Sequence, residues 1–371
     1  MKFLIISDAP TLYKEGKFYS YAPYVNEINL WTHNVTTTTI VSPTKYKKKL
    51  LVDSFKTKLK VSSIPAVSLV SNIEIIKTLV FLPNIFYKIF INMYKADHIH
   101  LRIPGSIGLL ACFVQIFFPS KPKTVKYAGN WDPRSKQPLS YRLQKWILSN
   151  TFLTKNCKVL VYGKWENQSK NIIPFFTASY KEEEIEKLGI KDISQTINLI
   201  FVGNFSRGKQ PMLAVKTLED LKDKGFNVIL NMYGDGVEFS KVQQYIATNK
   251  MENSVFLHGN TSKAAVKKAY NNSHFLLFIS KSEGWPKVVA EAMFWKCLPI
   301  ASNVSCVADM LDHGKRGTLV SAEVTAKEVS AIVANYLANP KIYQEQVVKA
   351  ANWSQQYTLE KFEAEIKKLL A

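Results

Sequence analysis

The feature that most constrains this fold is a regular alternation of short, β-branched-rich apolar runs with longer segments of helical pattern. Strands that alternate with helices at this spacing build parallel sheets from right-handed βαβ units. The expected strands are 3–7, 38–42, 98–101, 124–128 and 159–162 in the first half, then 198–202, 228–233, 255–258, 275–279, 299–301 and 318–320. Two such sets predict an α/β protein with two doubly wound Rossmann-like domains, whose ligands bind where loops leave the carboxyl ends of the strands.

The length of the chain fits that division. It has 371 residues, of which 47% are hydrophobic and 21% charged, as in ordinary folded proteins of about two domains. We predict an N-terminal domain over 1–175, a linker over 176–196 that carries a charged helix at 180–187, and a C-terminal domain over 197–352. A last helix over 353–371 is expected to pack back toward the N-terminal domain.

Several classes of protein are excluded by simple patterns. No apolar run approaches the roughly 20 residues of a membrane span. The apolar residues directly after Lys2 suit a first strand better than a signal peptide. The four cysteines form no C-x-x-C pair, which favours a reducing compartment. We therefore expect a cytoplasmic protein.

The positive charge is concentrated in the first half. Residues 1–180 contain 25 basic and 8 acidic residues, whereas the remainder contains 24 and 21. An anionic partner is expected, either nucleic acid or an anionic membrane face. The basic, aromatic-rich stretch 79–90 suits a helix on a membrane surface. The alternative interpretation is a core helix with solvated lysines.

The most informative segment is 280–293, which follows an expected strand. Its helix is expected over 287–296, with Pro286 near the first turn, and the N-terminus of that helix suits an anion such as a diphosphate. Glu283 lies in the loop and Glu291 lies within the helix, so both can accept hydrogen bonds from sugar hydroxyls. Alone, such a pair indicates only a solvated helix face.

A second segment, 201–209, ends another expected strand. Gly203 and Gly208 permit a tight turn, while Arg207 and Lys209 supply two cations suited to phosphate. It matches neither the phosphate loop of nucleotide triphosphatases nor the dinucleotide fingerprint. The alternative is a basic surface turn. A third strand ends in the glycine pair Gly234 and Gly236.

The order of these motifs, followed by 255–259 and by the Gly-Trp-Pro after Glu283, resembles the retaining GT-B glycosyltransferases of family 4. Their E-x7-E signature is matched by Glu283 and Glu291. The resemblance covers the C-terminal domain well and the N-terminal domain weakly. It is nearest to bacterial enzymes of capsule or lipopolysaccharide assembly. Asn204 and Gln210 depart from the family pattern, which often has arginine and glycine there.

The resemblance implies a GT-B fold, with two Rossmann-like domains facing a deep cleft and a nucleotide-sugar donor held by the C-terminal domain. Glu283 would contact the donor sugar and Glu291 the ribose, while Arg207 and Lys209 would neutralise the diphosphate. No metal or other cofactor is expected. The full set of implied donor contacts is Gly203, Asn204, Arg207, Lys209, Gly234, Gly284, Trp285, Pro286, Lys287, Val288 and Glu291.

The acceptor is expected in the N-terminal domain, where an aromatic and basic segment replaces the family's glycine-rich loop. The expected acceptor contacts are Lys14, Gly16, Tyr19, Arg102, Asn130 and Trp131. Further catalytic candidates are His100, pointing into the cleft, and Asp132, as a proton acceptor; the alternative for Asp132 is a turn residue before Pro133. His98 and His100 share a strand face but lack a third ligand nearby, so no metal site is expected.

The resulting hypothesis is a retaining glycosyltransferase (EC 2.4 class) that acts on a glycan or polyprenyl-diphosphate-linked acceptor in bacterial surface polysaccharide biosynthesis. It would work as a peripheral protein on the inner face of the cell membrane, without nucleic acid. A nucleotide-sugar epimerase or hydrolase, a nucleic-acid-binding protein and a catalytically silent scaffold are the alternatives. The donor nucleotide, the sugar, the linkage and the oligomeric state stay open.

Overall fold

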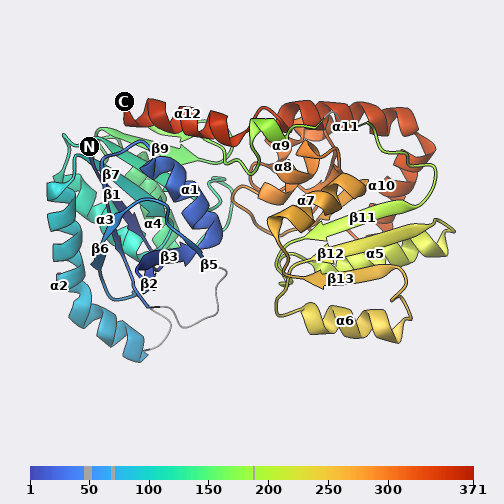
Figure 1. Ribbon diagram of the computed structural model, residues 1–371, viewed down its shortest axis with the longest axis horizontal. Helices are drawn as coiled ribbons and strands as arrows, with labels where there is room; N and C mark the ends of the chain where they lie inside the picture. The colour runs from blue at the N-terminus through green and yellow to red at the C-terminus, as the bar shows by residue number, and fades with distance from the viewer. Residues whose placement is uncertain (46–51, 68–71, 187–188) are drawn as a thin grey trace. The chain divides into compact units, whose positions relative to one another are not determined.

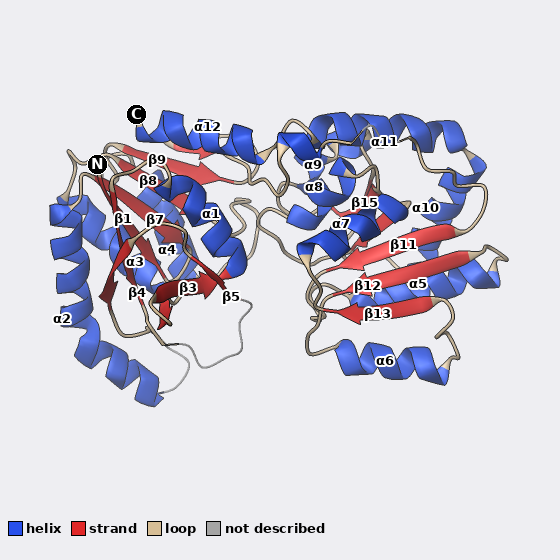
Figure 2. Cartoon of the chain, viewed as in Figure 1, coloured by secondary structure: helices blue, strands red, loops and turns tan. Residues whose placement is uncertain are grey.

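The computed structural model describes the chain except for residues 46–51, 68–71 and 187–188. It divides into two compact units. Unit 1 comprises Met1–Phe176 together with Phe362–Ala371, and unit 2 comprises Thr177–Lys361. Each unit contains a parallel sheet flanked by helices (Figures 1 and 2). The predicted α/β class with two Rossmann-like domains is confirmed.

The sheet of unit 1 has the strand order β10-β9-β8-β7-β1-β4-β6, and all its pairs are parallel. Its strands are β1 (Lys2–Ser7), β4 (Thr37–Ser42), β6 (Leu59–Ser63), β7 (His98–Ile103), β8 (Lys123–Tyr127), β9 (Cys157–Val161) and β10 (Ile172–Pro174). The five predicted strands form, within two residues at each end. The unpredicted β6 and β10 are the edge strands. β6 mixes polar and apolar residues, and β10 has only three residues.

The helices of unit 1 are α1 (Ala22–Thr32), α2 (Asn72–Lys95), α3 (Ser106–Val114) with the 3-10 turn η1 (Gln115–Phe117), and α4 (Leu139–Ser149). The inner sides of α2, α3 and α4 share one core with the sheet, formed by residues such as Ile89, Ala111, Ile147 and Leu101. On the other face, Trp31 of α1 stacks on Phe3. The end of α12 (Leu359–Leu370) completes unit 1, where Phe362 packs against Phe175 and Phe176.

A small antiparallel sheet was not expected from the sequence. It joins β2 (Leu12–Lys14), β3 (Lys17–Tyr21) and β5 (Val52–Ser54) in the order β2-β3-β5. Glu15 and Gly16 connect β2 to β3 with φ of 51° and 77°, which is the geometry of a tight hairpin turn whose twist matches the strands. The sheet thus shapes the segment that carries three of the predicted acceptor contacts.

The stretch 79–90 lies in helix α2, which buries one of its sides in the core. Ile85, Ile89 and Met93 are fully buried against the core, whereas Val80 and Tyr87 are exposed. It is therefore a core helix whose outer side is also apolar. Within the described parts of the chain, we find no helix with both the length and the hydrophobicity needed to cross a membrane.

The sheet of unit 2 has the order β13-β12-β11-β14-β15-β16. Its strands are β11 (Ile197–Val202), β12 (Val228–Tyr233), β13 (Val255–Gly259), β14 (Phe275–Phe278), β15 (Leu298–Ser302) and β16 (Thr318–Val320). Its helices are α5 (Pro211–Asp223), α6 (Phe239–Thr248), α7 (Lys263–Asn272), α8 (Lys287–Phe294), α9 (Val307–Met310), α10 (Ala326–Ala338) and α11 (Pro340–Ser354), with a 3-10 turn, η3, at Asp312–Gly314. Every predicted strand of this half is present.

The strand order of unit 2 reverses next to its first strand. The chain runs from β11 to β12 and β13 on one side and then crosses to β14 on the other. The loops that follow β11 and β14 therefore leave the sheet in opposite directions, and such a switch point opens a crevice at the carboxyl ends of the strands.

The charged helix predicted over 180–187 is wrong. Among the described residues of that segment, only the 3-10 turn η2 (Glu182–Glu184) forms, and Lys187 lies outside the described residues. None of the turn's residues is buried. A helix this short is not stable unless it buries an apolar face, and after Tyr180 the only apolar residue of the segment is Ile185.

Candidate active site

The two loops that flank the switch point of unit 2 are joined directly. The loop after β11 contains Arg207 to Lys209, and the loop after β14 contains Ser280 to Pro286. The backbone N–H of Lys281 donates a hydrogen bond to the carbonyl oxygen of Gly208 at 2.9 Å. Residues separated by more than 70 positions in the sequence are thereby held at one end of the sheet.

Lys209 and Glu283 form an ion pair at this place. Ser280 donates a hydrogen bond from Oγ to Glu283 Oε1 at 2.5 Å, and Lys209 Nζ lies 4.8 Å from the centre of the Phe278 ring. The two charged side chains are only 25% and 12% exposed. A cation and a carboxylate are therefore held in a partly desolvated position, where electrostatic interactions are stronger than in water.

Arg207 has a different partner and a different environment. Its side chain is 92% exposed, and its Nε lies 3.3 Å from Oε1 of Glu238 at the start of α6. Ion pairs this exposed contribute little to stability. The two cations that the sequence grouped together therefore have separate partners, and only Lys209 contacts Glu283.

The glycines after β11 and β12 allow two backbones to approach closely. Gly234 has a φ of +125°, and a Cβ there would lie 1.9 Å from the carbonyl oxygen of Gly203. A Cβ on Gly236 would lie 2.7 Å from the carbonyl oxygen of Phe205. These positions require glycine, because any side chain would collide with main chain. Exposed Asn204 lies between the two crossings.

Replacing Gly234 by alanine is expected to destabilise the protein by more than about 3 kcal/mol, because it combines a steric overlap with an unfavourable φ. Gly208→Ala is the matched control, since it lies in the facing loop with open space around its Cβ position. Urea unfolding should show a large loss of stability for Gly234→Ala alone. Equal stability of the two variants would contradict the observed backbone crossing.

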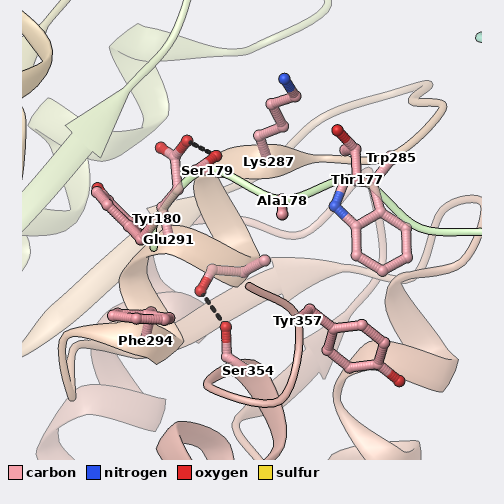
Figure 3. A pocket seen from close by; sticks show the side chains of 11 residues that line it. Thr177, Ala178, Ser179, Tyr180, Trp285, Lys287, Glu291, Phe294, Ser354 and Tyr357 are labelled. Carbon is pink, nitrogen blue, oxygen red and sulfur yellow. Dashed lines mark hydrogen bonds between the residues drawn. The ribbon is translucent and has the colours of Figure 1, made fainter. Parts of the chain in front are cut away.

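Glu291 lies on α8 and faces the segment that opens unit 2. It accepts a hydrogen bond from Ser179 Oγ at 2.5 Å, and Figure 3 shows the two side chains directed at each other in a shallow pocket. Burial, and then the charge of Glu291, raises the pKa of Tyr270 well above its usual value. The carboxylate therefore sits among hydroxyl groups, an environment suited to a polyol.

The other predicted donor contacts surround the start of α8. Pro286 is its N-cap, followed by Lys287 and Val288. The carbonyl of Gly284 accepts a hydrogen bond from Ser305 Oγ at 2.8 Å. Trp285 stacks on Trp353 with ring centres 6.4 Å apart, and Figure 3 places it with Tyr357 on the wall of the same pocket.

Sequence reasoning missed Ser179, Glu238 and Ser280, which contact predicted residues. It also missed Lys263, which contacts Ser179. Lys263 donates a hydrogen bond to the carbonyl of Ser179 and lies 4.7 Å from the Tyr180 ring centre. Ser280 follows a predicted strand directly, so its position at a strand end was a usable signal. Ser179 lies 112 positions from Glu291, and no local pattern marks it.

In unit 1, the predicted acceptor contacts fall into two groups. Lys14, Gly16 and Tyr19 lie on the β2–β3 hairpin, where Lys14 and Gly16 are exposed. Arg102 lies one residue before the end of β7, is mostly buried and forms an ion pair with Glu27 of α1. Asn130 accepts a hydrogen bond from the backbone N–H of Asp132 at 2.9 Å.

Two predicted site residues are core residues instead. His100 is fully buried, with its ring 4.3 Å from that of Trp31, so it does not point into a cleft. Trp131 is 2% exposed and donates a hydrogen bond to Gln168 at 2.9 Å, so it is not a surface contact for an acceptor. Both errors arise because a strand end and a loop can turn a side chain into the sheet's own core.

Asp132 behaves as the turn residue of the alternative interpretation. Its Oδ1 accepts a hydrogen bond from the backbone N–H of Arg134 at 2.9 Å, and the Arg134 Nε lies 3.4 Å away. In the described residues, no cluster of three or more His, Cys, Asp or Glu side chains is placed to hold a metal ion.

The two buried histidines predict a pH dependence of stability. Burial lowers the pKa of His98 to about 4 and that of His100 to about 3. The folded state therefore favours neutral histidine rings. Below pH 6.5, the ordinary pKa of histidine, the unfolded chain binds more protons than the folded chain. The contribution of these histidines to the free energy of unfolding is complete above pH 6.5. As the pH falls, the free energy of unfolding decreases by up to about 1.4 kcal/mol per pH unit for each histidine.

Urea unfolding between neutral and acidic pH tests this expectation, and His100→Phe should reduce the slope of stability against pH. The substituted ring keeps most of the packing against Trp31 but removes one proton-binding group. An unchanged slope in this variant would show that His100 does not titrate on unfolding.

Comparison with known proteins shows which sequences resemble parts of this chain. The family described as "Glycosyl transferases group 1" matches residues 181–353. Protein CapJ of Staphylococcus aureus is 23% identical over 242 residues, which cover 62% of this chain and 60% of CapJ. The chain thus aligns with less than two thirds of that relative's length.

Solved structures resemble the chain over its whole length. Anabaena HepE, solved in complex with UDP and glucose, has a TM-score of 0.66 at 13% identity and covers 100% of this chain and 99% of its own. WaaG, a glycosyltransferase involved in lipopolysaccharide biosynthesis, has a TM-score of 0.64 at 12% identity. The match covers 100% of this chain and 99% of the WaaG chain. At these identities the likeness establishes the fold.

Proposed function

We infer that this chain is a glycosyltransferase with a nucleotide-sugar donor. The GT-B fold and the match of the family described as "Glycosyl transferases group 1" to residues 181–353 support this inference. The observation that carries the proposal is the Lys209–Glu283 pair at the switch point of the second sheet. Ligands of open parallel sheets bind in the crevice at such a point.

Lys209 is proposed to stabilise the leaving group. Cleavage of the bond between the sugar and the nucleoside diphosphate develops negative charge on the terminal phosphate. A cation already fixed beside this position stabilises that charge without reorganising during the reaction. The ion pair, the nearby Phe278 ring and partial burial hold Lys209 in place, so the chain itself supplies the charge, and we propose that no metal cofactor takes part.

The two glutamates are proposed to bind hydroxyl groups of the donor. Glu283 would accept hydrogen bonds from the sugar, and Glu291 from the ribose. Both carboxylates already accept hydrogen bonds from hydroxyl groups, Glu283 from Ser280 and Glu291 from Ser179. These contacts support the assignment, because each carboxylate lies where an O–H group can donate to it. Their spacing matches the signature of retaining enzymes, and we propose that the anomeric configuration is retained.

The acceptor is proposed to be a lipid-linked glycan of a bacterial surface polysaccharide, reached at an anionic membrane face on the cytoplasmic side. The excess of basic residues in 1–180 supports an anionic surface. The described role of WaaG in lipopolysaccharide biosynthesis and the likeness to CapJ support a surface polysaccharide.

A thermal-shift screen against UDP, GDP, CMP and their sugar conjugates is the direct test. A nucleotide present at 100 times its dissociation constant should add about 2.7 kcal/mol of stability. One nucleotide class should stabilise the protein, and the matching sugar conjugate should then support transfer with retained configuration. No stabilisation by any nucleotide would contradict the proposal. Turnover without an acceptor would replace it with a hydrolase or epimerase.

A further inference from the structure

The helices α2, α3 and α4 form one layer on one face of the sheet of unit 1. Helix α3 contacts both of its neighbours, and all three bury side chains in the same core. Figure 2 shows α2 along the edge of this unit, with α3 and α4 beside it. The layer therefore has one buried side and one side directed away from the sheet.

The outer side of this layer is unusually apolar. Large apolar side chains are exposed on every element of it, namely Leu79, Val80, Tyr87 and Tyr94 of α2, Phe113 of α3, Phe117 of η1, and Leu139, Leu143 and Trp146 of α4. Phe152, just after α4, is 76% exposed, and Leu139 is 78% exposed. A helix at the surface of a globular protein normally places polar residues there.

Spacing and one ring contact group some of these side chains. Leu139, Leu143 and Trp146 follow the i, i+4, i+7 spacing that aligns residues on one side of a helix. The Phe90 ring of α2 lies 6.3 Å from that of Phe117, which links α2 to the end of α3. Exposed apolar patches of this extent mark interaction surfaces.

The exposed charge near α3 and α4 is mostly positive. Residues 98–165 contain eleven Lys and Arg residues, of which Lys123 and Lys126 are buried and Arg102 is mostly buried beside Glu27. The single acidic residue of this range, Asp132, accepts hydrogen bonds from Arg134. On the outer side, Arg142 lies beside Leu143 in the sequence, and Lys155 Nζ is 5.1 Å from the Phe152 ring centre. Cations and large apolar groups are thus interleaved.

We propose that the outer side of the α2–α3–α4 layer docks on an anionic phospholipid bilayer. Apolar groups that reach below the headgroups, next to cations that meet anionic headgroups, provide the two contributions that bind a surface segment to a membrane. The inference rests on the membrane-bound acceptor proposed above and assigns the surface that meets the lipid.

Other occupants fit this surface less well. In a two-fold dimer the same cations would face their own copies, and like charges oppose association. Nucleic acid would neutralise the cations, but phosphate contacts would leave Leu139 and Leu143 without an apolar partner. A bilayer with anionic headgroups satisfies both kinds of side chain.

The position of α4 connects this surface to the proposed acceptor. Helix α4 follows the loop at the carboxyl end of β8, which contains Asn130. A bilayer against α4 therefore lies next to the edge of the sheet where the loops of unit 1 collect, and a lipid-linked acceptor could extend from the bilayer to those loops.

Vesicle co-sedimentation of the full-length protein tests the proposal. Wild-type protein should bind phosphatidylcholine vesicles containing phosphatidylglycerol, and the binding should weaken with added salt. The variant Leu139→Gln/Trp146→Gln/Phe152→Gln should bind at least about tenfold more weakly. Lys136→Gln/Arg142→Gln/Lys155→Gln should bind on the order of a hundredfold more weakly, since each cation near the surface contributes about a factor of five.

The matched control is Val237→Gln/Ile342→Gln/Val348→Gln, which removes three exposed apolar side chains from unit 2. It should bind vesicles like the wild type. Equal loss in the control, or undiminished binding of the two α4 variants, would overturn the proposal. Stronger binding to an oligonucleotide than to vesicles, lost in the arginine and lysine variant, would identify nucleic acid as the occupant and overturn it as well.

The same variants separate this inference from the proposed function. Vesicle binding requires neither donor nor acceptor, and the α4 residues lie outside the donor site. Nucleotide-dependent thermal stabilisation should therefore be equal in the α4 variants and the wild type. Normal nucleotide-dependent stabilisation with undiminished vesicle binding of the α4 variants would overturn the docking surface only. Vesicle binding by the wild type that is lost in the α4 variants, in a protein that no nucleotide stabilises, would overturn the enzyme assignment only.

Discussion

Replacing Lys209 by methionine is expected to lower the rate of sugar transfer by about 10²–10³-fold, the usual cost of removing one preorganised group that stabilises transition-state charge. Methionine preserves the length and much of the apolar stem of the side chain but removes the ammonium group. The leaving phosphate then loses its partly buried cation. Steady-state kinetics with the donor identified by the thermal-shift screen would measure the effect, which should fall mainly on kcat.

Arg207→Met is the matched control for this experiment. It removes the same charge from the same loop, but from a side chain that is 92% exposed and paired with Glu238. We expect it to reduce transfer less than tenfold, because an exposed cation is screened by water and salt. A larger loss in Arg207→Met than in Lys209→Met would reverse the assignment of the two cations.

A second variant separates catalysis from folding. Lys209→Met leaves Glu283 largely buried without its partner, and an unpaired buried carboxylate destabilises a protein. Adding Glu283→Gln removes that charge, so the double variant should regain thermal stability. Its activity should stay low, because stability alone does not restore the cation at the phosphate.

Glu291→Gln is expected to weaken nucleotide binding by roughly 10–100-fold, the range for losing hydrogen bonds to a charged group. The amide keeps the shape of the side chain but replaces one acceptor oxygen by a donor, which meets the ribose hydroxyl less favourably. Isothermal titration with the nucleotide found in the thermal-shift screen would measure the change in Kd.

Ser179→Ala is the comparison for this prediction. The Ser179 hydroxyl donates a hydrogen bond to the carboxylate of Glu291 and would compete there with the ribose hydroxyl. Its removal should leave nucleotide affinity unchanged or slightly increased. If Ser179→Ala weakened binding as much as Glu291→Gln, the pair would serve to hold the fold of this segment rather than to bind the nucleotide.

The interior of each sheet could be predicted because it depends on short stretches of sequence. Central parallel strands are covered on both faces, so β1, β11 and β14 are almost wholly apolar and stand out as runs. The edge strand β6 and the β2–β3 hairpin were not predicted because their strands mix polar and apolar residues, and β10 was not predicted because it has only three residues. The segment 180–187 was misassigned because its charge suggested a helix while nothing showed that it lacks an apolar face.

The sequence by itself determined the fold class, the order of the strands along the chain and the loops that carry Lys209, Glu283 and Glu291, because strand ends and glycine turns are local features. Only the tertiary structure decided the partners. It pairs Lys209 with Glu283, whereas the neighbouring Arg207 pairs with Glu238. It directs Glu291 at Ser179 and buries His100 and Trp131. It also leaves apolar side chains exposed on the outer sides of α2 and α4. Each of these depends on which distant segments the sheet order brings together, and the free energy of burial or pairing is set by those neighbours and not by adjacent residues.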